Sequence, residues 1–147
     1  PVAMLRALQQ NLRNNGIISG ASTLSMQVAR MLDPHSRSLS GKLKQIFRAL
    51  QLEWRLSKTE ILELYFALAP FGGNLQGVEA ASRAYFGKAP LELSHAEAAL
   101  LAVLPQAPSR YRPDRHPVKA AEARNKLVKR LVENGVWPAT ILEEIRM

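Results

Sequence analysis

The sequence predicts an all-α fold, and three observations support this prediction. Apolar residues recur at helical spacing in every well-marked segment, whereas no stretch alternates like a half-buried strand. Ser-x-x-Glu patterns, which are typical of helix starts, open two of these segments. Several prolines stand at segment boundaries, where helices begin or end. Because the chain has 147 residues, of which 47% are hydrophobic, we expect one domain over residues 1–147 with a substantial core.

Two helices are expected in the first 34 residues. Apolar residues at spacings of three and four open the chain, and Asn-Asn-Gly at residues 14–16 ends the helix that they predict. Ser22 is the expected N-cap of the second helix. This helix should reach Leu32, because Pro34 disfavours helical backbone at the residue before it.

The next two helices follow closely. Ser40 is the expected cap of a helix whose inner face should consist of Leu43, Ile46, Phe47, Leu50 and Trp54. A capping box at residues 57–60 opens the following helix, and its inner face should consist of Ile61, Leu64, Tyr65 and Leu68.

The second half should hold four further helices and one connector. A short helix is expected from about residue 76 to 84, and a second capping box at residues 94–97 opens a helix that runs to Leu104. Residues 105–117 contain four prolines and should form an extended connector. A long helix should then start at Pro117 and end near Gly135, before a last short helix.

Charge and composition restrict the possible functions. The net charge is +8, and residues 1–50 hold seven Lys and Arg against one acid, Asp33. Such a positive field favours an anionic partner such as phosphate, nucleic acid or an acidic membrane surface, and a solvated basic face is the alternative. The absence of cysteine excludes disulfides and thiolate metal sites. No apolar run approaches the ~20 residues that a membrane span needs.

The second helix carries a polar row near its start. Thr23, Gln27 and Arg30 fall on one side of it, opposite the apolar residues. Backbone N–H groups at a helix N-terminus favour anions, and an Arg one turn further on strengthens such a site. The alternative is an ordinary amphipathic helix with a polar outer face.

The third helix repeats this polar pattern. Its polar stripe should consist of Gly41, Lys44, Arg48, Gln51 and Arg55, with Lys42 and Gln45 on one flank. A short connection joins the two helices, so we expect Arg30 and Lys42 to point into one cleft that Thr23 and Gln27 also line. No residues show the spacing of a metal site, a catalytic triad or a carboxylate pair.

Three stretches in order carry a family resemblance: GASTLSMQVAR at residues 20–30, GKLKQIFRALQLEWRLSKTEILELYFALAPFG at 41–72, and GVEAASRAYFGKAPLELSHAEAALLAVLPQAPSRYRP at 77–113. They resemble the peptidoglycan glycosyltransferase (transglycosylase) domain of class A penicillin-binding proteins. The resemblance implies a lysozyme-like helical fold and polymerisation of lipid II into glycan strands, with release of undecaprenyl pyrophosphate.

Partners and location also follow from the resemblance. It implies a divalent cation, Mg or Mn, and binding of lipid II, the growing glycan chain, the membrane surface and phosphoglycolipid inhibitors of the moenomycin type. The expected location is the periplasmic face of the bacterial inner membrane. The chain is expected to be a fragment, and the transmembrane anchor and transpeptidase domain of the parent would lie outside it.

The resemblance also assigns site residues. The pyrophosphate-binding residues would be Ser22, Thr23, Gln27, Arg30, Lys42, Lys44 and Arg48. The motif with the general-base Glu is absent from the 147 residues, so this fragment alone should be inactive. The family's second Glu is replaced by Gln45, and an Asn of the family by Ala67.

Two other functions stay open at this stage. One is a catalytically weak module that binds lipid II or polyprenyl phosphate, which the neutral Gln45 favours. The other is a basic helical nucleic-acid-binding domain. No helix-turn-helix signature supports it, and the aromatic residues lie mostly on apolar faces instead of alternating with basic ones.

Overall fold

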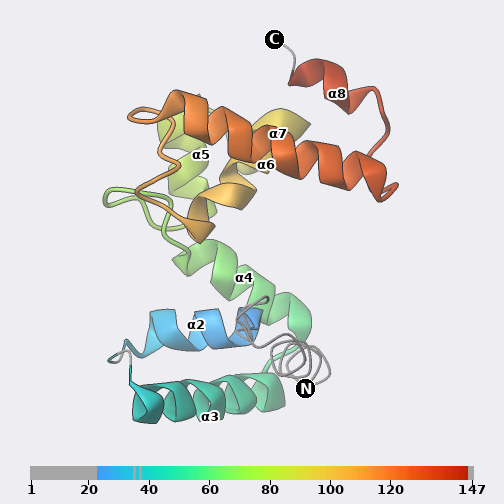
Figure 1. Cartoon of the computed structure of the whole chain (residues 1–147). Helices are drawn as coiled ribbons and strands as arrows, with labels where there is room; N and C mark the ends of the chain where they lie inside the picture. The colour runs from blue at the N-terminus through green and yellow to red at the C-terminus, as the bar shows by residue number, and fades with distance from the viewer. Residues whose placement is uncertain (1–22, 35, 37, 146–147) are drawn as a thin grey trace, which may run out of the picture. The chain divides into compact units, whose positions relative to one another are not determined.

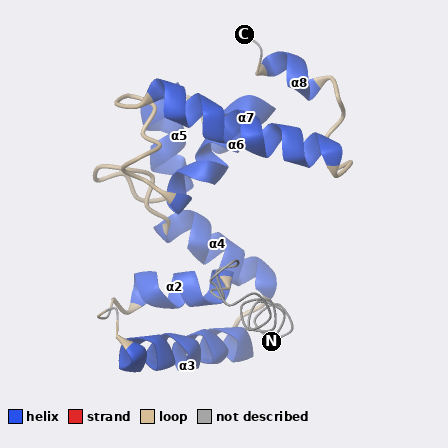
Figure 2. Ribbon diagram, in the orientation of Figure 1, coloured by secondary structure: helices blue, strands red, loops and turns tan. Residues whose placement is uncertain are grey.

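The computed structural model describes residues 23–34, 36 and 38–145. It divides into two compact units, Pro1–Tyr65 and Phe66–Met147. Figure 2 shows helices and loops, and the described residues form no strand beyond an isolated bridge between Pro70 and Gln76. The all-α class is therefore confirmed for the described part of the chain. The helix expected near the N-terminus and the cap Ser22 lie outside the described residues, and the single-domain assignment stays a prediction.

The first unit contains a helical hairpin (Figure 1). Helix α2 (Leu24–Leu32) packs along α3 (Leu39–Arg55), and side-chain contacts between opposite ends of the two helices show that they run antiparallel. The small core between them consists of the buried residues Met26, Ala29 and Ala49, and the partly buried side chains of Ile46 and Leu52 pack against it. The boundary between the two units falls within α4 (Lys58–Leu68).

The helix caps differ from the prediction at two of three starts. Thr23 caps α2, and its Oγ1 accepts a 3.3 Å hydrogen bond from the Met26 amide. Ser38 caps α3 in place of Ser40, because Ser38 has the extended backbone of a cap whereas Ser40 already lies inside the helix. The capping box at residues 57–60 is confirmed by reciprocal hydrogen bonds of 2.7 and 3.2 Å.

The predicted inner face of α3 is largely wrong. Leu43, Phe47, Leu50 and Trp54 are exposed, and Trp54 reaches 90%. The buried residues are Gly41, Gln45 and Ala49, at successive steps of four. This line faces α2 because Gly41 and Ala49 let the two helix backbones approach closely and Gln45 bonds across to the Met26 carbonyl. The bulky side chains are then left on the other side of α3. Ile46 alone of the predicted set lies against the core.

The second unit is built around two crossing helices, α6 (His95–Val103) and α7 (Pro117–Glu133) (Figure 1). Helix α5 (Val78–Phe86) and α8 (Ile141–Glu144) pack against α6. Two short 3₁₀ turns, η1 (Pro90–Glu92) and η2 (Leu104–Gln106), join these helices.

Two buried clusters hold this unit together. One consists of Leu100, Val103 and Ala120, and the other of Ala96, Ala99, Val128, Ile141 and Ile145. The four predicted helices are confirmed; the boundaries of the first three lie within two residues of the prediction, and the last helix begins at Ile141 instead of at residues 137–138. The expected connector differs at its start, where η2 occupies residues 104–106.

Candidate functional site

The polar row of α2 lies on its outer side. Ser25, Met26, Val28 and Ala29 form the buried side of the helix. Thr23 is half-buried at the N-cap, Gln27 is exposed, and Arg30 is partly exposed in the last turn. The structure therefore places these three residues on the solvent side of α2, as the periodicity predicts. Ser22 lies outside the described residues.

Gln45 lies at the interface between α2 and α3. Its side chain is buried, with the residue 4% exposed, and Nε2 donates a 2.6 Å hydrogen bond to the Met26 carbonyl. Lys42, one turn earlier on α3, donates to Gln45 Oε1 at 3.5 Å. The sequence places Gln45 on the flank of a polar stripe, but the structure uses it to tie the two helices together.

Lys44 and Arg48 meet at Asp33, the C-cap of α2. Lys44 Nζ lies 3.1 Å from Asp33 Oδ2 and Arg48 Nε lies 3.4 Å from the same oxygen. The hydrogen bond from Lys44 holds the pKa of Asp33 below its ordinary value. Two of the predicted pyrophosphate ligands thus share a carboxylate that closes the hairpin.

Two cavities lie along α3. One, of 490 Å³, is lined by polar and apolar residues of both helices: Ala29, Leu32, Asp33, Arg48, Gln51, Leu52 and Arg55. The second, of 350 Å³, shares Gln51 and Arg55 with the first and adds Phe47, Leu50 and Trp54. Arg48 and Arg55 thus supply positive charge beside an apolar surface. Neither cavity includes Arg30 or Lys42, so the expected cleft around that pair stays a prediction.

One site residue of the hairpin gives no signal in the sequence. Ser25 Oγ donates a 2.6 Å hydrogen bond to Glu53 Oε1, across 28 residues of chain. Ser25 falls on the apolar side of α2, where its small hydroxyl is inconspicuous. Only the pairing of the two helices brings Glu53 to it.

The carboxylates of the described residues do not fit a divalent cation. No group of three or more His, Asp or Glu side chains comes together in the part of the chain that the structure describes. Asp33 is held by two cationic side chains, and Glu53 by a hydroxyl at the other end of the hairpin. Mg²⁺ and Mn²⁺ prefer several oxygen ligands, carboxylates among them, so the donor set does not match the ion that the resemblance implies.

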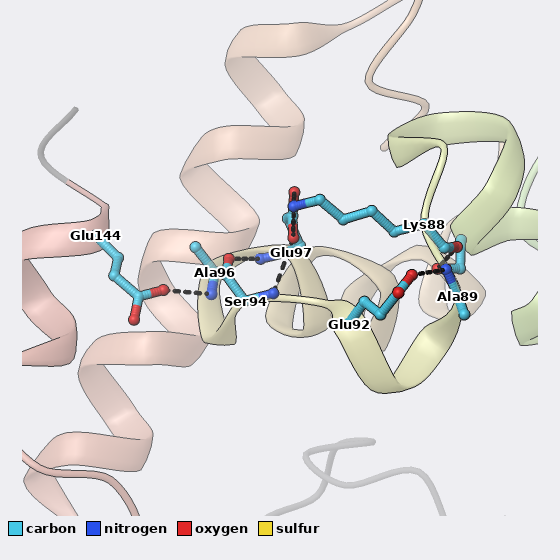
Figure 3. A network of polar contacts seen from close by, with 8 residues as sticks. Lys88, Ala89, Glu92, Ser94, Ala96, Glu97 and Glu144 are labelled. Carbon is cyan, nitrogen blue, oxygen red and sulfur yellow. Dashed lines mark hydrogen bonds and ion pairs between the residues drawn. The ribbon is translucent and has the colours of Figure 1, made fainter.

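A polar network in the second unit orders the start of α6 (Figure 3). Glu97 accepts from Lys88 Nζ at 2.8 and 2.9 Å and from the Ser94 amide at 2.8 Å. These hydrogen bonds lower the pKa of Glu97. On the other side of α6, Glu144 accepts from the Ala96 amide at 3.2 Å, which fastens α8 to this helix N-terminus.

His95 takes part in the same end of α6. Its Nδ1 lies 3.3 Å from Glu144 Oε1, and its ring meets that of Trp137 edge-on with centroids 4.9 Å apart. In the sequence, this histidine falls within the capping box at residues 94–97. The contacts come from α8 and from the turn before it, so no local pattern could have indicated them.

The glycine-containing loop between α4 and α5 packs on Arg112. A Cβ at Gly72 would lie 2.6 Å from Arg112 Cγ, and Gly72 has a φ of +101°. Tyr85 closes the other side of the loop with a 2.8 Å hydrogen bond to the Phe71 carbonyl, and burial raises the pKa of this tyrosine. The absence of a side chain at Gly72 therefore lets the backbone of this loop approach Arg112 closely.

Known proteins match the chain over nearly its whole length. The transglycosylase family model matches residues 1–132. The chain is 58% identical to penicillin-binding protein 1C of Escherichia coli K12 over 146 residues, which cover 99% of this chain and 19% of the relative. It is 43% identical to penicillin-binding protein 1A of Aquifex aeolicus, over 92% of this chain and 19% of that protein. The expected resemblance to the transglycosylase domain of penicillin-binding proteins is thereby confirmed.

A solved structure gives a further similarity. The crystal structure of penicillin-binding protein 1A from Haemophilus influenzae matches with a TM-score of 0.57 and 25% identity, over 84% of this chain and 16% of that one. The chain spans about a fifth of the length of the curated relatives it matches. No helix among the described residues is long and apolar enough to cross a membrane.

Proposed function

Because the chain belongs to the transglycosylase family, we propose that it is part of a peptidoglycan glycosyltransferase that polymerises lipid II during cell wall biogenesis. The observation that carries the proposal is the basic α2–α3 hairpin, which lies within the matched residues. Its cationic side chains are suited to a reaction whose leaving group is the anion pyrophosphate.

In this reaction, the 4-hydroxyl of the acceptor sugar attacks C1 of the lipid-linked growing chain. The O4–C1 bond forms while the bond from C1 to the phosphate oxygen breaks, with inversion at C1. The electron pair of the broken bond leaves on undecaprenyl pyrophosphate. The hydroxyl proton goes to a general base, which the resemblance places in a motif that these 147 residues do not contain.

The hairpin's part in the reaction is to stabilise the leaving group. Charge that develops on a departing pyrophosphate is best met by donors and cations already in position. Arg30 on α2 and Lys42 on α3 are the central candidates, and Thr23 and Gln27 would add neutral hydrogen bonds. The further proposed pyrophosphate-binding residues are Ser22, Lys44 and Arg48.

The exposed side of α3 supports contact with a membrane. Leucine, phenylalanine and tryptophan side chains are exposed along it, and Arg48 and Arg55 lie beside them. Apolar side chains with neighbouring cations suit the boundary between lipid headgroups and acyl chains. We place the protein at the periplasmic face of the bacterial inner membrane, where lipid II and moenomycin-type phosphoglycolipids would reach the hairpin.

A second candidate function is binding of lipid II or polyprenyl phosphate with little catalysis. The observation that favours it is Gln45, a neutral residue where the family carries a glutamate. Membership of the transglycosylase family removes the reason to consider a nucleic-acid-binding domain.

Lipid II binding to the full chain, measured by calorimetry in detergent, tests the proposed site. Arg30→Ala should weaken binding roughly 10- to 100-fold, because charge-assisted contacts are worth about 1.5–3 kcal/mol. Arg130→Ala, an equal loss of charge on α7, is the control and should have little effect. Equal losses in both variants would mean diffuse attraction to charge, which would contradict a defined site.

A further inference from the structure

We infer that the pyrophosphate site of this chain works with the cationic side chains of α2 and α3 in place of a divalent metal ion. The inference rests on the proposed function, since it concerns the same site. It departs from the resemblance, which implies Mg or Mn at the pyrophosphate. Two features support it, namely the hydrogen bonds that hold Gln45 and the positions of the carboxylates in the first unit.

Gln45 cannot serve as the missing metal ligand. A carbonyl oxygen only accepts hydrogen bonds, so the amide nitrogen of Gln45 must face the Met26 carbonyl, 2.6 Å away. The amide oxygen then faces the ammonium of Lys42, at 3.5 Å. A metal ion at this oxygen would be drawn by no negative charge and would be repelled by a neighbouring cation.

The acids that make contacts across the hairpin do not replace it. Asp33 ends α2, and Glu53 bonds to Ser25 at the beginning of α2. A helix of nine residues separates these two positions by about 13 Å, too far for one ion to bridge. Asp33 also already compensates Lys44 and Arg48.

The same side chains suit a pyrophosphate directly. Arg30 and Lys42 come from adjacent helices that Gln45 ties together. The planar guanidinium of Arg can donate two parallel hydrogen bonds to phosphate oxygens, and the ammonium of Lys supplies a compact positive charge. Gln45 acts here as a positioning residue, because it joins the helices without adding a negative charge that would compete with pyrophosphate for Lys42.

Calorimetry of the full chain with farnesyl pyrophosphate tests the inference. We expect affinities in EDTA and in excess Mg²⁺, corrected for the metal bound to the free probe, to agree within about twofold. Lys42→Ala should weaken binding roughly tenfold in both buffers. In parallel, the electron paramagnetic resonance signal of free Mn²⁺ should not fall when the protein is added.

Two substitutions at Gln45 sharpen the test. Gln45→Glu restores the family's carboxylate, so binding should weaken in EDTA and recover when Mg²⁺ is added. Gln45→Met removes both hydrogen bonds but adds no charge, so any binding that it retains should stay independent of metal. Gln106→Glu makes the same charge change in η2 of the second unit and should have no effect. Circular dichroism establishes that each variant keeps its helix content.

The outcomes separate the two proposals. A tenfold or larger gain in affinity with Mg²⁺ for the unsubstituted chain would overturn the inference and leave the pyrophosphate site standing. Loss of binding in both buffers would overturn the site itself, and the inference with it. A Gln45→Glu variant that binds like the unsubstituted chain in EDTA would overturn the role given to Gln45.

Discussion

Ser25 and Glu53 join the first turn of α2 to the last turn of α3 through a 2.6 Å hydrogen bond. At the opposite end of the hairpin, Lys44 pairs with Asp33, and Gln45 bonds to the Met26 carbonyl between the two. The hairpin is therefore fastened at both ends and in the middle. This arrangement fixes the spacing of Arg30 and Lys42, which the proposed function requires.

Loss of the Ser25 hydroxyl should destabilise this hairpin. Ser25→Ala leaves Glu53 without its donor, and we expect the free energy of unfolding to fall by about 1 kcal/mol, reduced by the better helix propensity of Ala. Urea unfolding of the full chain, followed by tryptophan fluorescence, measures the change. Ser109→Ala, at an exposed turn of the second unit, is the control. An equal effect in both variants would contradict a specific role for Ser25.

Local signals in the sequence predict the two capping boxes better than the inner face of α3. The capping boxes at residues 57–60 and 94–97 are confirmed because all their partners lie within four residues. The predicted inner face of α3 is wrong because the prediction uses hydrophobicity alone and so includes Phe47 and Trp54. In the structure, small residues such as Gly41 and Ala49 lie on the buried side, where they allow the helices to approach closely. The bond from Gln45 to Met26 depends on the register between two helices, which no local pattern contains.

The Asp33 carboxylate should titrate below an ordinary aspartate. The pKa of Asp33 is lowered chiefly by the hydrogen bond from Lys44, so Lys44→Met should raise it toward the ordinary value. Because the folded-state pKa is lower than the unfolded one, the ionised carboxylate stabilises the folded protein at any pH above the unfolded pKa. This stabilisation is lost as the pH falls through the folded-state pKa. The stabilisation by Asp33 should therefore be lost below about pH 4. A ¹³C NMR titration of the Asp33 carboxyl measures the midpoint, and Lys58→Met is the control. An unchanged midpoint in Lys44→Met would contradict this account.

The Lys88–Glu97 pair should contribute to the stability of the second unit. The Glu97 side chain is 22% exposed and accepts from Lys88 with both oxygens. Lys88→Met should lower the free energy of unfolding by about 1 kcal/mol at neutral pH, more than Lys126→Met on α7. Glu97→Gln retains an acceptor for the Ser94 amide, so in that background Lys88→Met should cost less. Full additivity of the two substitutions would exclude an interaction between them.

Gly72 should tolerate no side chain. Gly72→Ala would place a Cβ 2.6 Å from Arg112 Cγ and 2.9 Å from the Pro108 carbonyl, at a φ of +101°. We expect a loss of about 2 kcal/mol or more in the free energy of unfolding. Gly87→Ala is the matched control, because Gly87 also has a positive φ but nothing lies within 4 Å of its added Cβ. Its cost should stay near 1 kcal/mol. Similar losses at both positions would mean that crowding by Arg112 adds nothing.

The exposed side of α3 should bind lipid vesicles. The chain has two tryptophans, so a Trp137→Phe background makes Trp54 the sole tryptophan reporter. Trp54 is 90% exposed, and we expect its emission to shift to shorter wavelength when vesicles containing phosphatidylglycerol are added.

Phe47→Ser in the same background should weaken vesicle binding about fivefold, because roughly 1 kcal/mol of apolar burial is lost. Leu91→Ser removes an even more exposed apolar side chain from η1 in the second unit and should leave binding unchanged. High salt should weaken binding but not abolish it, since apolar contact remains after the Arg48 and Arg55 charges are screened. If Trp54 keeps its solvent-exposed emission at saturating lipid, another surface must meet the membrane and this side of α3 has a different partner.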